Sequence, residues 1–223
     1  MYDFLMKRVG LCGIILIMIK NIIFDVDGVL VDIHRTYTEF LKNTYPKFRN
    51  ITSNDLSTLF PIQADDGAIK LPDEFLVDFR TGPYYSYRPL FDDTMAVLAA
   101  LKKKDLKLFT LSAAGNPDKK LKWLLAAFGD IFDGYEFSPS GQSKKDALNA
   151  VVEKYALNKA ETVFVDDRIY QVRAGVEAGL CTVRMESVLS LPMPADLKGV
   201  PVVKSMTELS RVIDRINSDK DFL

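Results

Sequence analysis

The sequence has very little histidine, cysteine or net charge, and each shortage excludes a class of function. A single histidine among 223 residues, His34, excludes a histidine-rich metal site. The only two cysteines, Cys12 and Cys181, lie far apart without metal-ligand spacing, which favours a reducing compartment, the cytoplasm. The net charge is -1, so no basic surface argues for nucleic acid or an anionic membrane as the main partner.

The chain also lacks a hydrophobic run long enough to span a bilayer comfortably. Residues 9–19 are apolar and follow Lys7 and Arg8, as in a signal peptide, but no clear small-residue cleavage site follows them. We expect Met18 to be the natural start, with residues 1–17 a wrongly included extension. A surface helix, or less favourably a membrane anchor, is the alternative.

The most informative segment is a short apolar run that ends in two carboxylates. Residues 22–24 predict a buried strand, and Asp25, Asp27 and Gly28 follow it directly. Because an unpaired buried carboxylate is costly, these acids fit the carboxyl end of a parallel strand, where α/β sheets bind ligands. Gly28 permits a sharp turn or a close backbone approach.

The rest of the chain alternates strand and helix patterns, which predicts a doubly wound parallel sheet in an α/β core. Hydrophobic residues make up 48% and charged residues 26%, as in an ordinary globular protein. Further strands are predicted at residues 106–111, 162–165, 181–184 and 200–203, and helices at 37–45, 92–103, 116–128, 143–155, 169–178 and from 205 onward. Asp92 or Asp93 is expected to cap the helix at 92–103, and Gly179 to end the helix at 169–178. Capping boxes are expected at Ser143 with Asp146 and at Ser205 with Glu208.

A polar segment rich in proline and glycine interrupts this alternation up to about residue 88. It is too long for a loop and too poor in strand signals for more sheet, so a small, mostly helical insertion fits best. We therefore assign residues 18–33 and 89–223 to the core and residues 34–88 to a helical insertion.

A second apolar run ending in acids, at residues 163–167, repeats the pattern of the first. Asp166 and Asp167 would reach the same sheet edge as Asp25 and Asp27. Repulsion among four carboxylates raises their pKa values unless a cation is present, and Mg²⁺ prefers such oxygen ligands. The pattern therefore predicts a magnesium site.

These segments, in this order over roughly residues 20 to 184, resemble the four motifs of the haloacid dehalogenase superfamily, mostly Mg²⁺-dependent phosphatases and phosphotransferases. The resemblance implies a Rossmann-like core, with Asp25 as the nucleophile that becomes an aspartyl-phosphate and Asp27 as general acid and base. It implies that Asp25, Asp167 and the backbone carbonyl of Asp27 ligate the metal. Asp166 would lie behind them, orienting a lysine.

The second and third motifs are less specific. Ser112, at the end of a strand, resembles the phosphoryl-binding hydroxyl of the second motif, with Thr110 as the alternative. Lys144 fits the lysine of the third motif by its spacing, although Lys145 is one residue away. The fourth motif commonly has a further acid four residues after the metal ligand, where this chain has Gln171.

The resemblance implies hydrolysis of a small-molecule phosphomonoester, with the insertion acting as a cap that selects the substrate. His34, Lys70 and Arg80 are candidate substrate contacts, Arg80 or Lys70 for a second anionic group. Dehalogenases of the superfamily lack the acid/base aspartate and need no metal, so Asp27 and Asp167 argue against that chemistry. A sugar-phosphate mutase remains the closest alternative, and a non-catalytic binding protein a more distant one.

Overall fold

The computed structural model describes residues 18–56, 74–187 and 192–218. Within these ranges a six-stranded sheet, all of whose pairings are parallel, has the order β3-β2-β1-β4-β5-β6. Its strands are β1 (Asn21–Phe24), β2 (Lys107–Ala113), β3 (Gly134–Ser138), β4 (Thr162–Asp166), β5 (Cys181–Met185) and β6 (Val202–Val203). The predicted fold class, a doubly wound α/β sheet, is confirmed.

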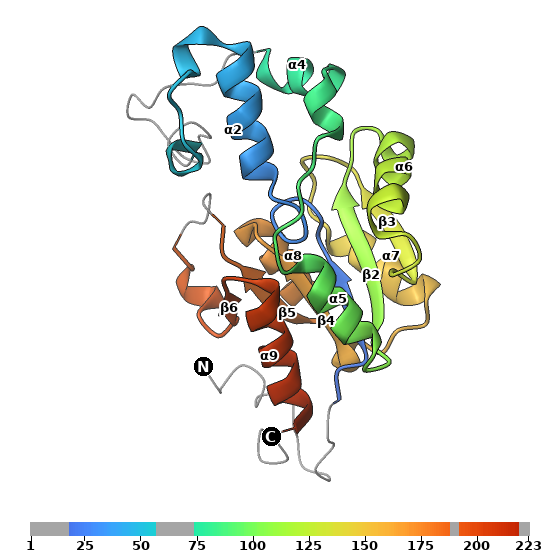
Figure 1. The fold of residues 1–223 in the computed structure, drawn as a ribbon. Coiled ribbons are helices and arrows are strands. Elements are labelled where there is room, and N and C mark those ends of the chain that lie inside the picture. Colours follow the sequence, from blue (N-terminus) through green and yellow to red (C-terminus); the bar gives the residue numbers. More distant parts are fainter. Residues whose placement is uncertain (1–17, 57–73, 188–191, 219–223) are drawn as a thin grey trace, which may run out of the picture.

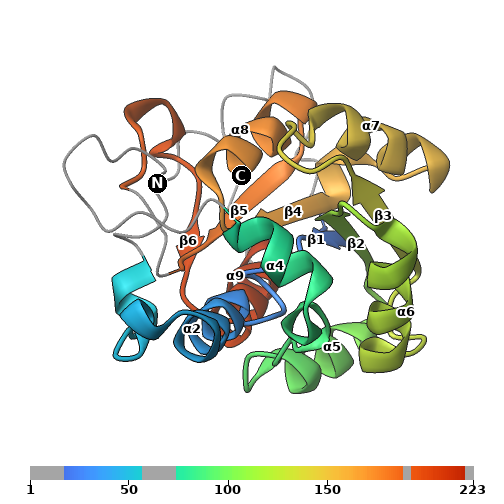
Figure 2. The same ribbon diagram turned by 90° about the horizontal axis from the view of Figure 1, so that it is seen from above.

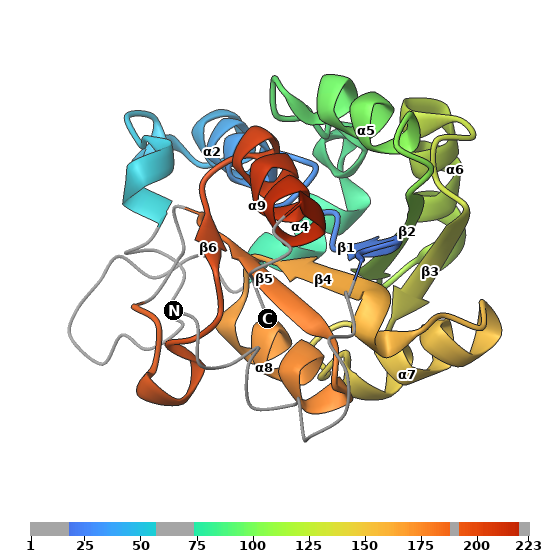
Figure 3. The ribbon, with the colours of Figure 1, turned by 90° about the horizontal axis from the view of Figure 1, so that it is seen from below.

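Helices cover both faces of this sheet (Figures 1 and 3). Apolar residues of three helices pack on one face: α5 (Thr94–Lys102), α6 (Pro117–Phe128) and α9 (Met206–Ser218). Two helices pack on the other: α7 (Lys145–Lys154) and α8 (Ile169–Ala178). The short helices η4 (Lys159–Glu161) and η5 (Ala195–Leu197) lie in connections. The central strand β1 is fully buried because it is covered on both sides.

The insertion between β1 and β2 is helical and lies over the carboxyl ends of the central strands (Figures 1 and 2). Its described elements are α2 (Ile33–Thr44), η1 (Pro46–Phe48), η2 (Ser53–Asp55), α4 (Phe75–Thr81) and η3 (Pro83–Ser86). They enclose a small core of their own, rich in aromatic rings such as Phe40, Phe75 and Phe79. We call these elements the cap.

The two chain segments that join the cap to the core run side by side. The backbone N–H of Asp32 donates to the carbonyl of Pro89 at 2.8 Å, and Val31 forms an antiparallel bridge with Leu90. Because both connections are tied together beside β1, the cap is anchored within a few residues of Asp25.

The structure differs from the sequence prediction at several element ends. The strand β3 was not predicted, because its five residues begin with glycine and lie at the sheet edge without a continuous apolar run. Asp93 does not cap α5 through its side chain, which instead accepts hydrogen bonds from the backbone and hydroxyl of Thr207. At Ser143 the predicted capping box is also wrong, since α7 begins later and its N-cap, Lys144, makes no capping bond.

At Ser205 half of the predicted box forms: the hydroxyl accepts from the N–H of Glu208, but the Glu208 carboxylate accepts from the N–H of Lys204. The predicted N-terminal extension, residues 1–17, lies outside the described residues. Across the residues that the structure describes, none of the helices combines the length and apolar character needed to cross a membrane.

Candidate active site

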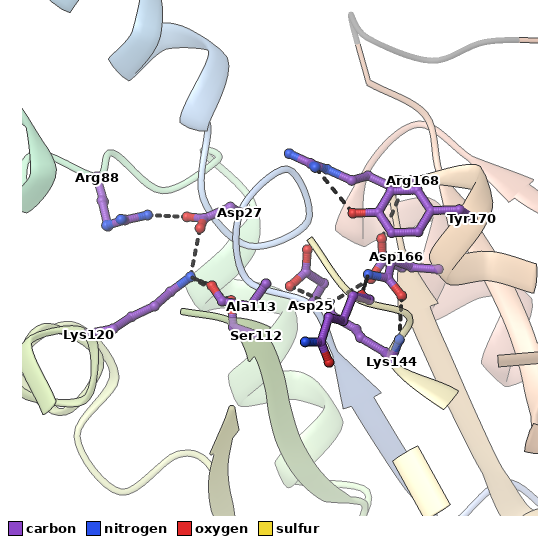
Figure 4. Close-up of polar contacts among 12 residues, drawn as sticks. Asp25, Asp27, Arg88, Ser112, Ala113, Lys120, Lys144, Asp166, Arg168 and Tyr170 are labelled. Atoms are coloured by element: carbon purple, nitrogen blue, oxygen red, sulfur yellow. Dashed lines mark hydrogen bonds and ion pairs between the residues drawn. The ribbon is translucent and has the colours of Figure 1, made fainter. Parts of the chain in front are cut away.

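The first carboxylate of the site lies at the end of β1 and forms an ion pair with a buried lysine. The Lys144 ammonium lies 2.7 Å from Oδ1 of Asp25 and 2.8 Å from Oδ2 of Asp166, the last residue of β4 (Figure 4). Burial lowers the pKa of Lys144, but the two carboxylates outweigh it and raise the pKa well above its usual value. Lys144 is therefore a permanent cation beside Asp25. Lys145 is only half-buried and pairs with Glu177 instead.

A third carboxylate, Asp167, completes a buried cluster. Ligand oxygens of Asp25, Asp166 and Asp167 all lie within 4.8 Å of one another. Burial, with repulsion from Asp166 and Asp25, raises the pKa of Asp167 far above its ordinary value. Gly28, at a φ of +91°, makes this close approach possible, because a Cβ there would lie 2.6 Å from Oδ2 of Asp167.

This cluster fits a divalent cation. Oδ1 of Asp167 is buried and lacks a hydrogen-bond partner among the described residues, whereas its Oδ2 accepts from Ser187 at 3.3 Å. An unpaired buried carboxylate oxygen facing two further carboxylates is unfavourable by itself, and an oxygen-preferring cation satisfies it. Asp166 differs from Asp167, since both of its oxygens accept hydrogen bonds, from Lys144 and from the backbone of Arg168.

Asp27 lies on the other side of Asp25 and is held by two cations (Figure 4). Arg88, at the return from cap to core, pairs with Oδ1, and Lys120 of α6 lies 2.7 Å from Oδ2. Burial raises the pKa of Asp27, but Lys120 and Arg88 outweigh it and hold the pKa far below the usual range. Asp27 is therefore a carboxylate in this arrangement. Arg88 also donates to the carbonyl of Tyr85, within the cap.

Ser112, on β2, contacts the same lysine as Asp27. Its hydroxyl oxygen is 2.6 Å from the Lys120 ammonium, which also lies 3.2 Å from the carbonyl of Ala113. Thr110, the alternative to Ser112, is fully buried, and its hydroxyl has no partner among the described side chains and backbone. Ser112 lines the cavity described below and Thr110 does not.

Gln171, at the position where a further acid is common, does not point at the carboxylates as a ligand. Its amide oxygen accepts from the backbone N–H of Lys144 at 2.7 Å, and its amide nitrogen donates to the carbonyl of Gln142 at 2.9 Å. Gln171 therefore fastens the segment that carries Lys144 to α8.

A cavity of about 300 Å³ opens between this site and the cap. Among the predicted substrate contacts, Arg80 lines it from α4, and its guanidinium carbon would lie 3.9 Å from a Cβ at Gly115 of the core. His34 is buried in α2 and is not among the lining residues, and Lys70 lies outside the described residues. The size suits a small ligand.

Two functional candidates were missed from the sequence, Lys120 and Arg168. Lys120 shares the buried stripe of α6 with Leu124 and Phe128 at a spacing of four, so a lysine on an apolar helix face was the available signal. Arg168 follows the acidic pair and lines the cavity, with its guanidinium near the hydroxyl of Tyr170. No periodicity distinguishes such a loop residue.

The family model for haloacid dehalogenase-like hydrolases matches residues 19–179. No curated protein sequence matched the chain.

Three solved structures illustrate the shared fold. A predicted phosphoglycolate phosphatase from Haemophilus somnus is 22% identical, with a TM-score of 0.61, over 87% of this chain and 97% of that one. The L-2-haloacid dehalogenase from Xanthobacter autotrophicus, with chloropropionic acid bound, is 20% identical, with a TM-score of 0.62, over 88% and 99%. A Bacteroides vulgatus protein provisionally named β-phosphoglucomutase is 17% identical, with a TM-score of 0.59, over 91% and 92%.

Proposed function

The chain belongs to the haloacid dehalogenase-like hydrolase family, and we propose that it is a Mg²⁺-dependent hydrolase of small phosphomonoesters that acts through an aspartyl-phosphate on Asp25. One observation carries this proposal: Asp25, Asp166 and Asp167 gather in a buried cluster, with an unpaired oxygen on Asp167, below a cavity also lined by Lys144 and Ser112.

In the first half of the reaction, a carboxylate oxygen of Asp25 attacks phosphorus and the bond to the leaving oxygen breaks. Lys144, already paired with Asp25, offsets the negative charge that gathers on the phosphoryl oxygens. The Ser112 hydroxyl donates to one of those oxygens. Asp25, Asp167 and the backbone carbonyl of Asp27 would hold a bound Mg²⁺, which would supply positive charge that offsets the negative charge of nucleophile and phosphate.

In the second half, Asp27 accepts a proton from water, which then attacks the aspartyl-phosphate and releases inorganic phosphate. The ion pairs to Lys120 and Arg88 keep Asp27 in the carboxylate form that this step requires. Earlier, Asp27 must carry a proton to the departing alcohol. Because both cations oppose that protonated form, leaving groups that depart without a proton should react most easily.

Two observations separate this proposal from dehalogenation, the chemistry named for one structural neighbour. Dehalogenases of the superfamily share the first aspartate, the counterpart of Asp25. They lack the acid/base aspartate and need no metal, so they have no counterpart of Asp27 or of the metal ligand Asp167. Asp27 is paired with two cations of its own, and Asp167 has a buried oxygen, without a partner among the described residues, that a metal cation would satisfy.

A phosphosugar mutase is the second candidate, since one neighbour carries that provisional name. It would use the same residues but pass the phosphoryl group from Asp25 to a sugar hydroxyl rather than to water. The cavity of about 300 Å³ accommodates a small substrate in either reaction.

We assign residues 34–88 to substrate selection. Arg80 reaches from the cap toward Gly115, just after Ser112, and forms no ion pair with another described residue. A cation placed there would contact a second anionic group on the substrate, such as a carboxylate.

The test is ³¹P NMR of a panel of phosphomonoesters incubated with the protein, with Mg²⁺ or with EDTA. The phosphatase proposal predicts inorganic phosphate that appears only with Mg²⁺. A new sugar phosphate without inorganic phosphate would favour the mutase. No change with any compound, from a folded protein that also fails to bind Mg²⁺, would overturn the proposal.

A further inference from the structure

A buried lysine that the proposed steps use only through its ion pair with Asp27 also contacts a second residue of the site, Ser112. Lys120, in the first turn of α6, is 2% exposed and lines the cavity, and its ammonium points toward Asp27 and Ser112 (Figure 4). Burying an ammonium group is costly, so its retention on the apolar face of a helix calls for matching acceptors.

The contacts of Lys120 account for every hydrogen that it can donate. Oδ2 of Asp27 lies at 2.7 Å, the Ser112 hydroxyl at 2.6 Å and the carbonyl of Ala113 at 3.2 Å. An ammonium group has three N–H donors and no acceptor. With all three engaged, Lys120 has no donor left for a substrate, so it acts through the groups it holds.

The direction of the bond to Ser112 fixes the direction of the serine hydroxyl. Because Lys120 can only donate, the Ser112 oxygen must accept, and the hydroxyl hydrogen points elsewhere. Among the described residues, no acceptor is within hydrogen-bond distance of the Ser112 hydroxyl hydrogen. Ser112 lines the cavity, so the hydrogen is available to an anion bound there.

We infer that Lys120 is a positioning residue that orients the Ser112 hydroxyl as a donor to a phosphoryl oxygen and at the same time holds Asp27 in place. One side chain thus aligns the phosphoryl-binding group and the acid/base group. This inference rests on the proposed function, since it takes the anion in the cavity to be a phosphoryl group.

The test is a double-mutant cycle on the binding of inorganic phosphate in the presence of Mg²⁺, measured by titration calorimetry. The variants are Ser112→Ala, Lys120→Met and the double variant. We expect each single variant to raise the Kd about tenfold, one hydrogen bond to a charged group. The double variant should be no weaker than the weaker single one, because Lys120 acts through Ser112.

Lys122→Met is the matched control, because Lys122 is exposed on the same helix. It should bind phosphate like the wild type. If thermal unfolding shows that Lys120→Met does not fold, Lys120→Gln takes its place in the cycle, since its amide still offers N–H donors without the charge.

Three results would overturn the inference. One is an unchanged phosphate Kd for Ser112→Ala, which needs no Lys120 variant at all. Another is an unchanged Kd for the folded Lys120 variant, and the third is multiplication of the two single effects in the double variant. Each is distinct from failure of the proposed function, because phosphate binding is measured without turnover. A wild type that releases phosphate from esters and shows any of these results would lose only the inference.

Discussion

Gly28 and Asp167 illustrate how a single missing side chain permits the site. Gly28 has a positive φ, a backbone conformation that other residues avoid. The Asp167 carboxylate lies so close to its Cα that a methyl group at this position would clash with it. Any side chain at position 28 would push the Asp167 carboxylate away from Asp25. Glycine after the acids is therefore a requirement of the carboxylate cluster.

Gly28→Ala should destabilise the fold by about 1–3 kcal/mol and weaken Mg²⁺ binding, because the new methyl group displaces Asp167. Thermal unfolding with and without Mg²⁺ measures both effects. Gly129→Ala is the control, since Gly129 also has a positive φ but nothing within 4 Å of a Cβ. Equal Mg²⁺ stabilisation in both variants would contradict this account.

His34 provides a pH prediction because it is buried in the cap with its Nε2 unpartnered among the described atoms. Burial lowers the pKa of His34 to about 4. Between about pH 4 and about pH 6.5 the imidazole is therefore neutral in the folded protein but protonated in the unfolded chain. Stability should therefore fall as the pH drops from about 6.5 to about 4, by about 3 kcal/mol at most.

His34→Gln should lack this part of the acid sensitivity, so the difference between wild type and variant in denaturant unfolding at pH 4.5 and pH 7 isolates it. The chain has one histidine, so its imidazole gives one NMR titration curve. A His34 pKa near 6.5 would show that the ring is not buried as described.

The sequence predicted which residues belong to the site where they follow a repeated strand pattern. It did not predict those that reach the site only through tertiary packing. Asp25 and Asp167 each follow an apolar strand, and parallel strands bring their carboxyl ends together. Lys120 belongs to an ordinary amphipathic helix, and only the packing of α6 against β2 turns it toward Ser112. The sequence alone left Lys144 and Lys145 open, since a shift of one residue on a helix start changes which side chain faces the core.

At the scale of secondary-structure elements, Gln171 joins α8 to the segment that precedes α7. Its amide oxygen accepts from the backbone N–H of Lys144 and its amide nitrogen donates to the carbonyl of Gln142, so it links α8 to the single loop before α7. An acid at this position would keep the acceptor but lose the donor. The glutamine therefore suits the position of Lys144 rather than metal binding.

Gln171→Ala should cost about 1–3 kcal/mol of unfolding free energy, because it leaves the buried N–H of Lys144 without its acceptor. Denaturant unfolding measures the loss. Arg173→Ala on the same helix breaks an exposed ion pair with Asp196 and should cost less than about 1 kcal/mol. An equal cost for the two variants would contradict the role assigned to Gln171.

Strands and helices were predicted best where the hydrophobic pattern was long, and element ends were predicted least well. The helix α8 and its termination at Gly179, in a left-handed conformation, are as predicted. The strand β3 was missed because an edge strand needs no continuous apolar run. The predicted N-cap of α5 was wrong because a residue distant in the sequence uses the same carboxylate: Asp93 accepts hydrogen bonds from Thr207 instead of from the helix.

At the scale of the whole molecule, the cap and the core meet across the cavity through arginine side chains. Arg88 connects the cap to Asp27 in the core, and Arg80 approaches Gly115 from α4. The cap therefore contributes positive charge to a site whose acids all come from the core. Under the proposed function, this division would let the cap select substrates without altering the carboxylate cluster.

Arg80→Gln should raise KM about tenfold for phosphomonoesters that carry a second anionic group, and leave KM unchanged for neutral ones such as p-nitrophenyl phosphate. Steady-state kinetics with matched pairs of substrates measures the difference. Arg35→Gln, an exposed change on α2, is the control. A similar rise in KM for both substrate types would assign Arg80 to the phosphoryl group itself.

The most direct test of the whole account is Mg²⁺-dependent phosphate release from a reactive ester by the wild type and by Asp25→Asn, with Asp118→Asn, an exposed change on α6, as control. We predict metal-dependent turnover that Asp25→Asn lowers by at least on the order of 10³-fold, since the nucleophile is lost. Asp118→Asn should behave as the wild type. Turnover that survives Asp25→Asn, or that proceeds equally in EDTA, would contradict the assignment of Asp25 as the nucleophile of a magnesium-dependent phosphatase.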